Sequence, residues 1–313
     1  MGKRAAGLRS QQDRRRERAR IGTLQDNVVS RPTLRRYQHL FDSLRTFASD
    51  HGFDVQTLPQ LDEVLCSYIT MLWEDGMPKG DANYTYAAVR HFLATLAPPL
   101  NGAKRLLHAW DKAELPARAL PFTPMLLLGV AGAMDLLGHR RAGLLSILMF
   151  HCLLRTSEGL TLQCKHLAVA ADGRSGAVVL PSTKTSVRNK VCEVVTIDCP
   201  RVAAIARELL HGRSPGDPVS DMPMYKYREL FHKALAIFGL DNKGYTPYSL
   251  RRGGATWDFR HHGQMERSLI RGRWSSTRSA RLYITDGVAQ LAQLQLRPDQ
   301  TSLLQAAAAR LRV

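Results

Sequence analysis

The sequence predicts a mainly α-helical protein of two domains, the second of which also contains a small antiparallel β-sheet. Three observations support this fold class. Apolar residues recur at helical spacing along most of the chain, a proline-containing stretch near residue 118 interrupts that pattern, and β-rich pieces occur only in one short region beyond it. With 313 residues, the chain is long for one core and long enough for two.

The first predicted domain covers residues 28–115 and consists of short helices. It contains three stripes of apolar residues at helical spacing, which are joined by polar or Gly/Pro turns. The stripes are Leu34, Tyr37, Phe41, Leu44 and Phe47; Leu61, Val64, Leu65, Tyr68, Ile69, Leu72 and Trp73; and Tyr86, Val89, Phe92, Leu93 and Leu96. Side chains spaced in this way face one side of a helix, so we expect most of them to form a core.

The N-terminal segment before this domain is strongly basic. Residues 1–21 contain eight Lys/Arg and two Asp/Glu, with almost no large apolar groups. This composition predicts a disordered arm over residues 1–27. Such an arm could bind phosphates or carry a nuclear address, or it could only keep the chain soluble.

The second predicted domain covers residues 118–296 and is followed by a helical tail, 297–313. Pro116, Pro121 and Pro124 mark the boundary, because each disfavours helix at the residue before it. We expect helices at about 124–137 and 141–153, strands near 178–180 and 191–197, and helices again from Arg201 onward. The segment from Val288 onward, which carries Leu291, Leu294 and Leu296, could dock on a neighbouring protomer, or it could pack against its own chain.

The overall charge favours a polyanionic partner. The formal net charge is +17 and the pI is about 10.1, and basic side chains release counterions when they bind phosphates. Ribosome-associated and membrane-surface proteins share such a charge, so it does not by itself identify the partner. The longest apolar run, 142–154, is too short to span a membrane. The N-terminus lacks the apolar core of a signal peptide, so we expect an intracellular protein.

The cysteines indicate neither disulfides nor a metal. They are odd in number and scattered: Cys66, Cys152, Cys164, Cys192 and Cys199. That pattern suits a reducing compartment better than a disulfide framework. Cys164 and His166 lie close in sequence, but no second pair of this kind follows, so we predict no zinc site.

Arg155 is the first candidate for chemistry. It follows the apolar run 147–154 and precedes Glu158 by three residues. A cation at the end of a buried helix is costly unless it pairs with an acid or binds an anion. A helix-end ion pair with Glu158 is the simpler interpretation, and an anion site is the functional one.

A basic segment and the tyrosine that follows it are the other candidates. Residues 251–281 contain eight arginines and two acidic residues, interleaved with Trp257, Phe259 and Trp274. Dense basic charge on helical elements is typical of nucleic-acid contacts, although a solvated face is the alternative. Tyr283 follows in Ala-Arg-Leu-Tyr-Ile, where a packed core tyrosine is the commoner outcome.

Taken in order, these features resemble the catalytic domain of the tyrosine recombinases, or phage integrases. Leu-Leu-Arg-Thr-Ser-Glu-Gly-Leu-Thr-Leu is similar to the first-arginine box of the family, with Arg155 as the arginine and Glu158 as its supporting acid. Lys184, in Thr-Lys-Thr between the two β-rich pieces, is similar to the strand-turn lysine. Tyr-Ser-Leu-Arg-Arg-Gly-Gly-Ala-Thr resembles the second box, with Arg251 as the second arginine.

The remaining positions extend this resemblance. Gly-Arg-Trp-Ser-Ser resembles the next box, with Trp274 where the family has His or Trp, and Tyr283 then matches the nucleophile. The separations of 23 residues from Arg251 to Trp274 and nine from Trp274 to Tyr283 are usual for Cre-like members. The resemblance covers roughly residues 28–296. It is specific in the C-terminal half and only topological in the N-terminal half, which is similar to the helical, SAM-like core-binding domain.

The resemblance implies a site-specific recombinase or integrase, a class found in mobile elements. Tyr283 would form a covalent 3′-phosphotyrosyl link with DNA, while Arg155, Arg251 and Trp274 would bind the phosphate oxygens. Lys184 would protonate the leaving 5′-oxygen. No cofactor is implied, neither ATP nor a required metal.

The partners implied are double-stranded DNA and further copies of the chain, as dimers or tetramers on DNA, with no membrane partner. A nuclear or nucleoid location follows from this. The residues expected to contact DNA beyond the catalytic set are Arg188, Lys190, Arg252 and Arg273.

One position departs from the family pattern. Tyr248 occupies the start of the second box, where the family normally has His and less often Lys. A tyrosine can donate a hydrogen bond to a phosphate oxygen but cannot shuttle protons near neutral pH. A catalytically weakened DNA-binding protein with the recombinase fold is therefore one alternative. A relaxation enzyme similar to type IB topoisomerases is another, and a basic RNA- or ribosome-binding protein is a third, which would not explain the spaced set.

Overall fold

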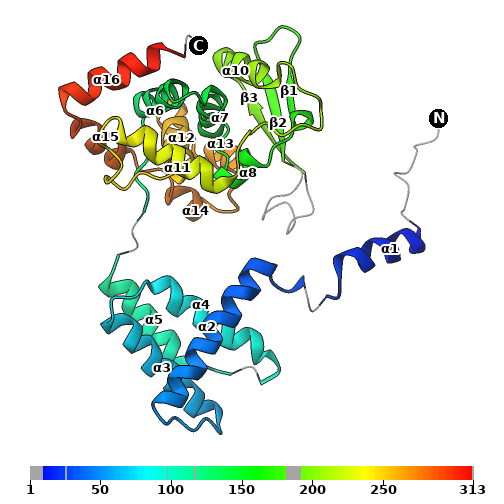
Figure 1. The fold of residues 1–313 in the computed structure, drawn as a ribbon, viewed down its shortest axis with the longest axis vertical. Coiled ribbons are helices and arrows are strands. Elements are labelled where there is room, and N and C mark those ends of the chain that lie inside the picture. The colour runs from blue at the N-terminus through cyan, green and yellow to red at the C-terminus, as the bar shows by residue number, and fades with distance from the viewer. Residues whose placement is uncertain (1–9, 25–26, 97, 116–117, 181–191, 312–313) are drawn as a thin grey trace. The chain divides into compact units, whose positions relative to one another are not determined.

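The computed structural model describes residues 10–24, 27–96, 98–115, 118–180 and 192–311. The chain forms two compact units, Met1–Ala117 and Arg118–Val313 (Figure 1). The division lies beside residue 118, in the proline-containing stretch that interrupts the helical pattern. Within the described ranges, no helix is long and apolar enough to cross a membrane.

The described part of the first unit consists of helices and their connections. Its elements are α1 (Gln11–Ile21), α2 (Arg31–Asp50), α3 (Leu58–Glu74), α4 (Lys79–Phe92), the short 3-10 helix η2 (Ala94–Leu96) and α5 (Asn101–Ala113). Residues of the three apolar stripes form its core, among them the buried Leu44, Leu65 and Val89. Trp73, at the end of the second stripe, is instead 44% exposed.

Helix α1 differs from the disordered arm that the composition predicts. The Ser10 hydroxyl accepts a hydrogen bond from the Asp13 N–H at 3.1 Å, and the Asp13 carboxylate accepts one from the Ser10 N–H at 3.3 Å. This capping box satisfies amides that a helix start otherwise leaves free. Because the segment has few apolar residues to bury, the cap is the main local stabilisation that we identify for α1.

The second unit combines helices with one small sheet. Its elements are α6 (Pro124–Leu136), α7 (Arg140–His151), α8 (Thr156–Leu160), η3 (Cys164–His166), β1 (Leu167–Val169), β2 (Gly176–Leu180), β3 (Glu193–Ile197), α10 (Pro200–Leu210), α11 (Met224–Ala236), α12 (Tyr248–His262), α13 (Met265–Gly272), α14 (Thr277–Arg281), α15 (Asp286–Leu294) and α16 (Pro298–Ala309). The helices expected at 124–137 and 141–153 are present as α6 and α7, with ends that differ by one or two residues.

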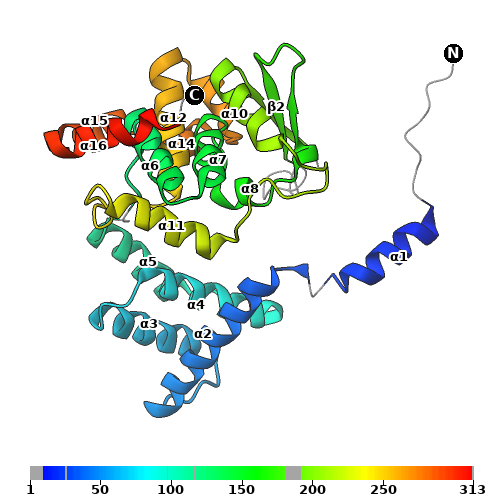
Figure 2. The same cartoon turned by 45° about the horizontal axis from the view of Figure 1, so that its top comes forward.

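The sheet is antiparallel, with the order β1-β2-β3. Val178 in the central strand is fully buried and pairs with Leu167 on one side and Val195 on the other. Strands β2 and β3 match the two β-rich pieces of the sequence, whereas β1 was not predicted. The sheet lies at one end of this unit beside α10, and α16 lies at the other end (Figures 1 and 2).

The C-terminal tail packs against its own chain. Leu304 of α16 is fully buried in the main core of the unit, against α6. At Gly132 of α6, an added Cβ would lie 2.0 Å from the Ala307 carbonyl oxygen, so the two helices approach each other at backbone distance. Leu291 and Leu294 of α15 remain exposed. Packing in cis is therefore the arrangement of α16.

Candidate active site

A tight turn between α7 and α8 positions Arg155 and Glu158. Leu153 has a φ of 49°, in the left-handed region that non-glycine residues rarely adopt. Arg155 caps the start of α8, and its N–H donates to Glu158 Oε2 at 2.8 Å. Its guanidinium also donates to Glu158 Oε1. The ion pair considered from the sequence is thus formed, and 28% of the Arg155 side chain remains exposed for a further contact.

Arg251, from the first turns of α12, is fully buried beside this turn. Its guanidinium donates to the Leu153 carbonyl and, at 2.7 Å, to the Gly272 carbonyl. Glu158 Oε2 lies 3.7 Å from Arg251 Nη1. Burial and the nearby Arg273 and other cations lower the pKa of Arg251 to about 10, so it still carries its charge at neutral pH.

Two adjacent glycines explain how α12 comes so close to the turn. An added Cβ at Gly253 would lie 2.2 Å from the Phe122 carbonyl oxygen, and one at Gly254 would lie 2.1 Å from the Phe150 carbonyl oxygen. A side chain at Gly253 would push α12 away from Phe122, and one at Gly254 would push it away from α7. The Gly-Gly pair that follows the arginines of the second box therefore has a packing role, which brings Arg251 to the α7–α8 turn.

Arg273 forms a second arm of the same network. Its φ of 58° turns the chain at the end of α13. Its guanidinium donates to Glu158 Oε2 at 2.7 Å, and its Nε lies 3.2 Å from Glu193 Oε2 on β3. Only 5% of the Arg273 side chain is exposed. This geometry favours a positioning role over the DNA contact that the sequence suggested.

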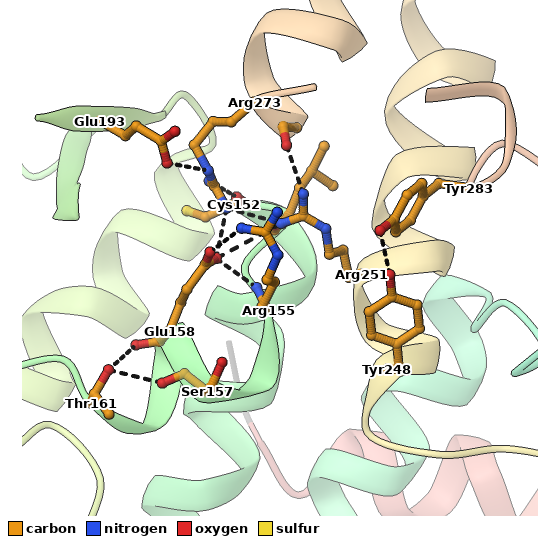
Figure 3. A network of polar contacts seen from close by, with 12 residues as sticks. Cys152, Arg155, Ser157, Glu158, Thr161, Glu193, Tyr248, Arg251, Arg273 and Tyr283 are labelled. Atoms are coloured by element: carbon orange, nitrogen blue, oxygen red, sulfur yellow. Dashed lines mark hydrogen bonds and ion pairs between the residues drawn. The ribbon is translucent and has the colours of Figure 1, made fainter. Parts of the chain in front are cut away.

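Glu158 is the centre on which the three arginines converge (Figure 3). Burial by itself raises the pKa of the Glu158 carboxyl. The charge of Arg273, the Arg155 N–H and the charge of Arg251 outweigh burial, and the pKa lies below its usual 4.5. The single negative charge of Glu158 holds the three arginines close together, and the cluster keeps a net positive charge.

Trp274 follows in a small apolar cluster with Leu153 and Ala280. It is 7% exposed, and its ring covers Gly272, where an added Cβ would lie 2.0 Å from a ring carbon. Among the described residues, its buried indole N–H makes no hydrogen bond of normal geometry. It lies close enough to the Tyr283 oxygen to favour the ionised phenol.

Tyr283 lies between α14 and α15 and faces this cluster. Its ring centre lies 4.7 Å from that of Trp274 and 5.4 Å from the Arg251 guanidinium carbon. Its carbonyl accepts a hydrogen bond from Thr256 Oγ1 at 3.1 Å, which fixes its backbone to α12. Tyr248, at the start of α12, donates a hydrogen bond to the Tyr283 hydroxyl, and the two rings point toward each other in Figure 3.

The Tyr283 phenol is shifted toward ionisation. Burial by itself raises its pKa. The hydrogen bond from Tyr248, the charge of Arg251, the nearby Trp274 N–H and the charge of Arg155 outweigh burial, and the pKa of Tyr283 lies below its usual 10.0. Burial and the proximity of Tyr283 raise the pKa of Tyr248 instead. The two phenols are therefore chemically distinct.

The structure thus brings together six residues that the sequence singled out: Arg155, Glu158, Tyr248, Arg251, Trp274 and Tyr283. Lys184, Arg188 and Lys190 lie outside the described residues. Arg252 is 6% exposed and donates to Thr285 Oγ1 at 3.4 Å. Its burial does not favour the open phosphate contact expected for it.

A group behind the site was missed by sequence reasoning. Arg271 donates to the His151 carbonyl at 3.1 Å and to Asp198 Oδ1 at 3.1 Å. These bonds join α13 to the end of α7 and to the β3–α10 connection. His151 lies two residues before Leu153, and Arg271 lies next to Gly272, so the network borders both carbonyls that bind Arg251. Burial favours the protonated form of Asp198, but bonding by Arg267 and Arg271 overrides it, and its pKa falls to about 2. Only the density of arginines in 251–281 hinted at this network.

Neither a candidate metal site in the described part of the structure nor a match by sequence to a known protein was found. Within the described ranges, no group of His, Cys, Asp and Glu side chains is arranged to hold a metal ion. No protein-family model and no curated protein sequence matches the chain.

Solved structures do match it. The chain is similar to the Tn1549 transposon integrase in complex with transposon right end DNA, with a TM-score of 0.61 and 13% identity over 90% of this chain and 97% of that one. It is also similar to a lambda integrase dimer bound to a COC′ core site, with a TM-score of 0.60 and 14% identity over 84% and 74% of the two chains.

A third match is the XerH site-specific recombinase in a post-cleavage complex with palindromic difH substrate. The TM-score is 0.52 and the identity is 13%, over 76% of this chain and 72% of that one. These matches confirm the mainly helical fold class with its small antiparallel sheet. They also confirm, at the level of fold, the resemblance that the spaced residues indicated: the chain has the fold of the tyrosine recombinases.

Proposed function

We propose that the chain is a tyrosine-type DNA recombinase, which breaks and rejoins DNA strands through a covalent link to Tyr283. The observation that carries this proposal is the meeting of Arg155, Arg251 and Tyr283 at one site. They come from three separate parts of the chain, and their proximity supports a strand-transfer reaction. A nucleophile beside two guanidinium groups is suited to attack on a phosphodiester.

The charges of the site fit the transition state of that attack. Extra negative charge develops on the non-bridging phosphate oxygens, and guanidinium groups bind such oxygens bidentately. Arg155 offers a partly exposed guanidinium, whereas Arg251 is fully buried, is held by two backbone carbonyls and contributes its fixed positive charge to the site. Donors held in place in this way lower a barrier more than mobile ones.

Each strand transfer then proceeds by exchange of one ester for another. The Tyr283 oxygen forms a bond to phosphorus, the bond from phosphorus to the 5′-oxygen breaks, and the 5′-oxygen leaves as a hydroxyl. We propose Lys184 as the acid that protonates it. A 5′-hydroxyl from another strand reverses the step, so the reaction consumes neither ATP nor metal-bound water.

Double-stranded DNA is the proposed partner. The similar Tn1549 integrase is in complex with transposon right end DNA, the lambda integrase dimer is bound to a core site and XerH is bound to a difH substrate. The net charge of +17 also favours phosphate binding. We propose that the helical unit up to Ala117 contacts DNA as a core-binding domain. Assembly as a dimer or tetramer on DNA is part of the proposal, which the dimer of lambda integrase supports.

The second candidate is a DNA-binding protein whose cutting activity is weakened. The single observation in its favour is Tyr248, because it replaces the imidazole that the family pattern has there. A neutral phenol with a raised pKa takes up no proton near pH 7. This candidate shares the partner of the first and differs only in the chemistry.

A suicide-substrate trap distinguishes the two. The protein is incubated with a pool of DNA duplexes that carry nicks or 5′-bridging phosphorothiolates, and denaturation-resistant protein–DNA adducts are isolated and sequenced. We expect an adduct with the wild-type chain and none with Tyr283→Phe. The matched control is Tyr225→Phe, since Tyr225 is 66% exposed and lies away from the site on α11.

Loss of the adduct in Tyr283→Phe alone would support the recombinase. DNA binding without any adduct, over a pool that contains the bound sequence, would favour the weakened protein. Adding supercoiled plasmid to the same preparation tests for relaxation, which would indicate strand rotation in the manner of a type IB topoisomerase.

A further inference from the structure

We propose that Tyr248 is itself a catalytic residue, which activates Tyr283 by donating a hydrogen bond to the attacking oxygen. This role differs from a contact with the DNA phosphate, and it rests on the proposed function of Tyr283 as the nucleophile. Under this proposal, the tyrosine that stands in place of the family's His or Lys takes part in catalysis.

The geometry of the pair is the first support. The Tyr248 hydroxyl donates directly to the Tyr283 hydroxyl, and the ring centres lie 5.7 Å apart at an angle of 53°. Tyr248 belongs to the first turn of α12, three residues before the buried Arg251. The anchoring of Arg251 to two carbonyls therefore also fixes the turn that presents Tyr248.

The charged surroundings decide which of the two phenols ionises. The cations whose charge acts on the pair are Arg155 from α8 and Arg251 and Arg252 from α12. They favour a phenolate somewhere in the pair, but two adjacent phenolates would repel each other. Tyr283 receives the hydrogen bond and Tyr248 gives it, so the negative charge is best accommodated on Tyr283. The directions of the two pKa shifts agree with this assignment.

The proton balance follows from the direction of the hydrogen bond. Tyr248 keeps its proton throughout, because a donor to the attacking oxygen cannot also accept the proton from it. The Tyr283 proton passes to hydroxide or a buffer base in solution before attack. The phenolate then bonds to phosphorus as the 5′-oxygen leaves, and that oxygen takes its proton from the acid proposed above.

The proposal predicts a pH dependence with a definite sign. Cleavage should rise with pH as Tyr283 ionises and then level off. Because Tyr248 lowers the pKa of Tyr283, its removal in Tyr248→Phe should move this rise to higher pH. Below the plateau we expect about a tenfold slower cleavage, which is the effect of one charge-assisted hydrogen bond. At the alkaline end the two rates should converge.

A merely structural role for Tyr248 would give a different profile, with cleavage reduced by the same factor at every pH. That result would overturn the proposal. Tyr248→His provides a rescue, because an imidazole N–H can also donate to the phenolate. We expect it to cleave much faster than Tyr248→Phe near neutral pH, whereas equal loss in both would count against the hydrogen bond.

A measurement without DNA separates this proposal from the proposed function. The chain is labelled at the tyrosine ζ-carbon, and the phenol resonances are followed by NMR as pH is raised, with Tyr283 assigned from Tyr283→Phe. In Tyr248→Phe the Tyr283 resonance should titrate at higher pH than in the wild type. In the control Tyr225→Phe it should not move.

The NMR titration tests the activating hydrogen bond, and the adduct assay tests the proposed function, so each can fail without the other. An unchanged Tyr283 titration in Tyr248→Phe would overturn the activating bond even in an active recombinase. A shifted titration in a protein that never cuts DNA would support the bond and count against the proposed function. An adduct that persists in Tyr283→Phe and disappears in Tyr248→Phe would overturn both, since Tyr248 would then be the nucleophile.

Discussion

Trp274 brings to the site a hydrogen-bond donor that no described residue accepts with normal geometry. A buried N–H without a well-aligned partner costs free energy, and an oxygen of a bound ligand is one group that can complete it. Its ring lies against that of Tyr283, the proposed nucleophile. We therefore predict that this N–H binds a phosphate oxygen on which negative charge develops during cleavage.

Replacing this donor should slow cleavage with little effect on folding. Trp274→Phe keeps an aromatic ring over Gly272 but removes the N–H, and we predict about a hundredfold slower adduct formation, typical of a lost oxyanion donor. Single-turnover cleavage on the trapped DNA sequence measures it. Trp257→Phe, on the 44% exposed Trp257 of α12, is the matched control and should cleave normally. Equal rates in both variants would remove Trp274 from the mechanism.

The residues of the site were largely predictable, but their partners were not. The spacing of three residues between Arg155 and Glu158 predicted their ion pair. The separation of nine residues from Trp274 singled out Tyr283. The anchors of Arg251 are backbone carbonyls, and every residue type has one, so the sequence does not mark them. Arg273 bears the same charge as its neighbours, and only the fold shows that it binds Glu158 and Glu193 instead of solvent.

At the scale of elements, close contact between α12 and α7 holds the site together. Gly254 lies where a Cβ would be 2.1 Å from the Phe150 carbonyl oxygen, and backbone cannot yield as a flexible side chain can. The same contact carries Leu153, whose carbonyl binds Arg251. Damage to this packing should therefore affect stability and activity together.

Gly254→Ala tests this contact. We predict a loss of about 1–3 kcal/mol in the free energy of unfolding, as for other overpacked sites, together with slower cleavage. Urea unfolding followed by circular dichroism measures the first effect. Gly287→Ala is the matched control, because nothing lies within 4 Å of the added Cβ in α15. A Gly254→Ala protein as stable as that control would show that α12 can shift freely.

Elements were predicted well where apolar periodicity was long and poorly where structure is short or local. Helices α6 and α7 follow from their apolar runs, and β2 and β3 from valine-rich pieces. Strand β1 has only three residues, too few for a period to be visible. Helix α1 was predicted as disordered because composition says nothing of a cap, and its cap depends on two side chains, Ser10 and Asp13.

At the scale of the whole molecule, the chain is strongly positive. The chain carries 44 Lys and Arg against 27 Asp and Glu. Much of the basic charge inside the site is already paired, as with Arg273 and Arg271, so it is the exposed remainder that is available to DNA. Binding that depends on such charge releases counterions from the phosphates.

DNA binding by the full chain should therefore weaken steeply with salt. For a footprint of about four phosphates or more, we predict at least about a hundredfold lower affinity at 200 mM salt than at 50 mM. Fluorescence anisotropy with a labelled duplex at several salt concentrations measures the slope. An affinity independent of salt would contradict a phosphate-based interface, and tighter binding to single-stranded RNA than to the duplex would favour an RNA-binding protein.

The carbonyl anchors of Arg251 have a consequence for mutational robustness. A substitution at Leu153 changes the side chain but leaves its carbonyl in place, so the loss of the side chain does not by itself delete that anchor. Only changes that move the main chain, such as an insertion in the turn or a proline, would release the guanidinium. Deep mutational scanning should therefore find Leu153 more tolerant of substitution than of insertion, while Arg251 itself tolerates neither.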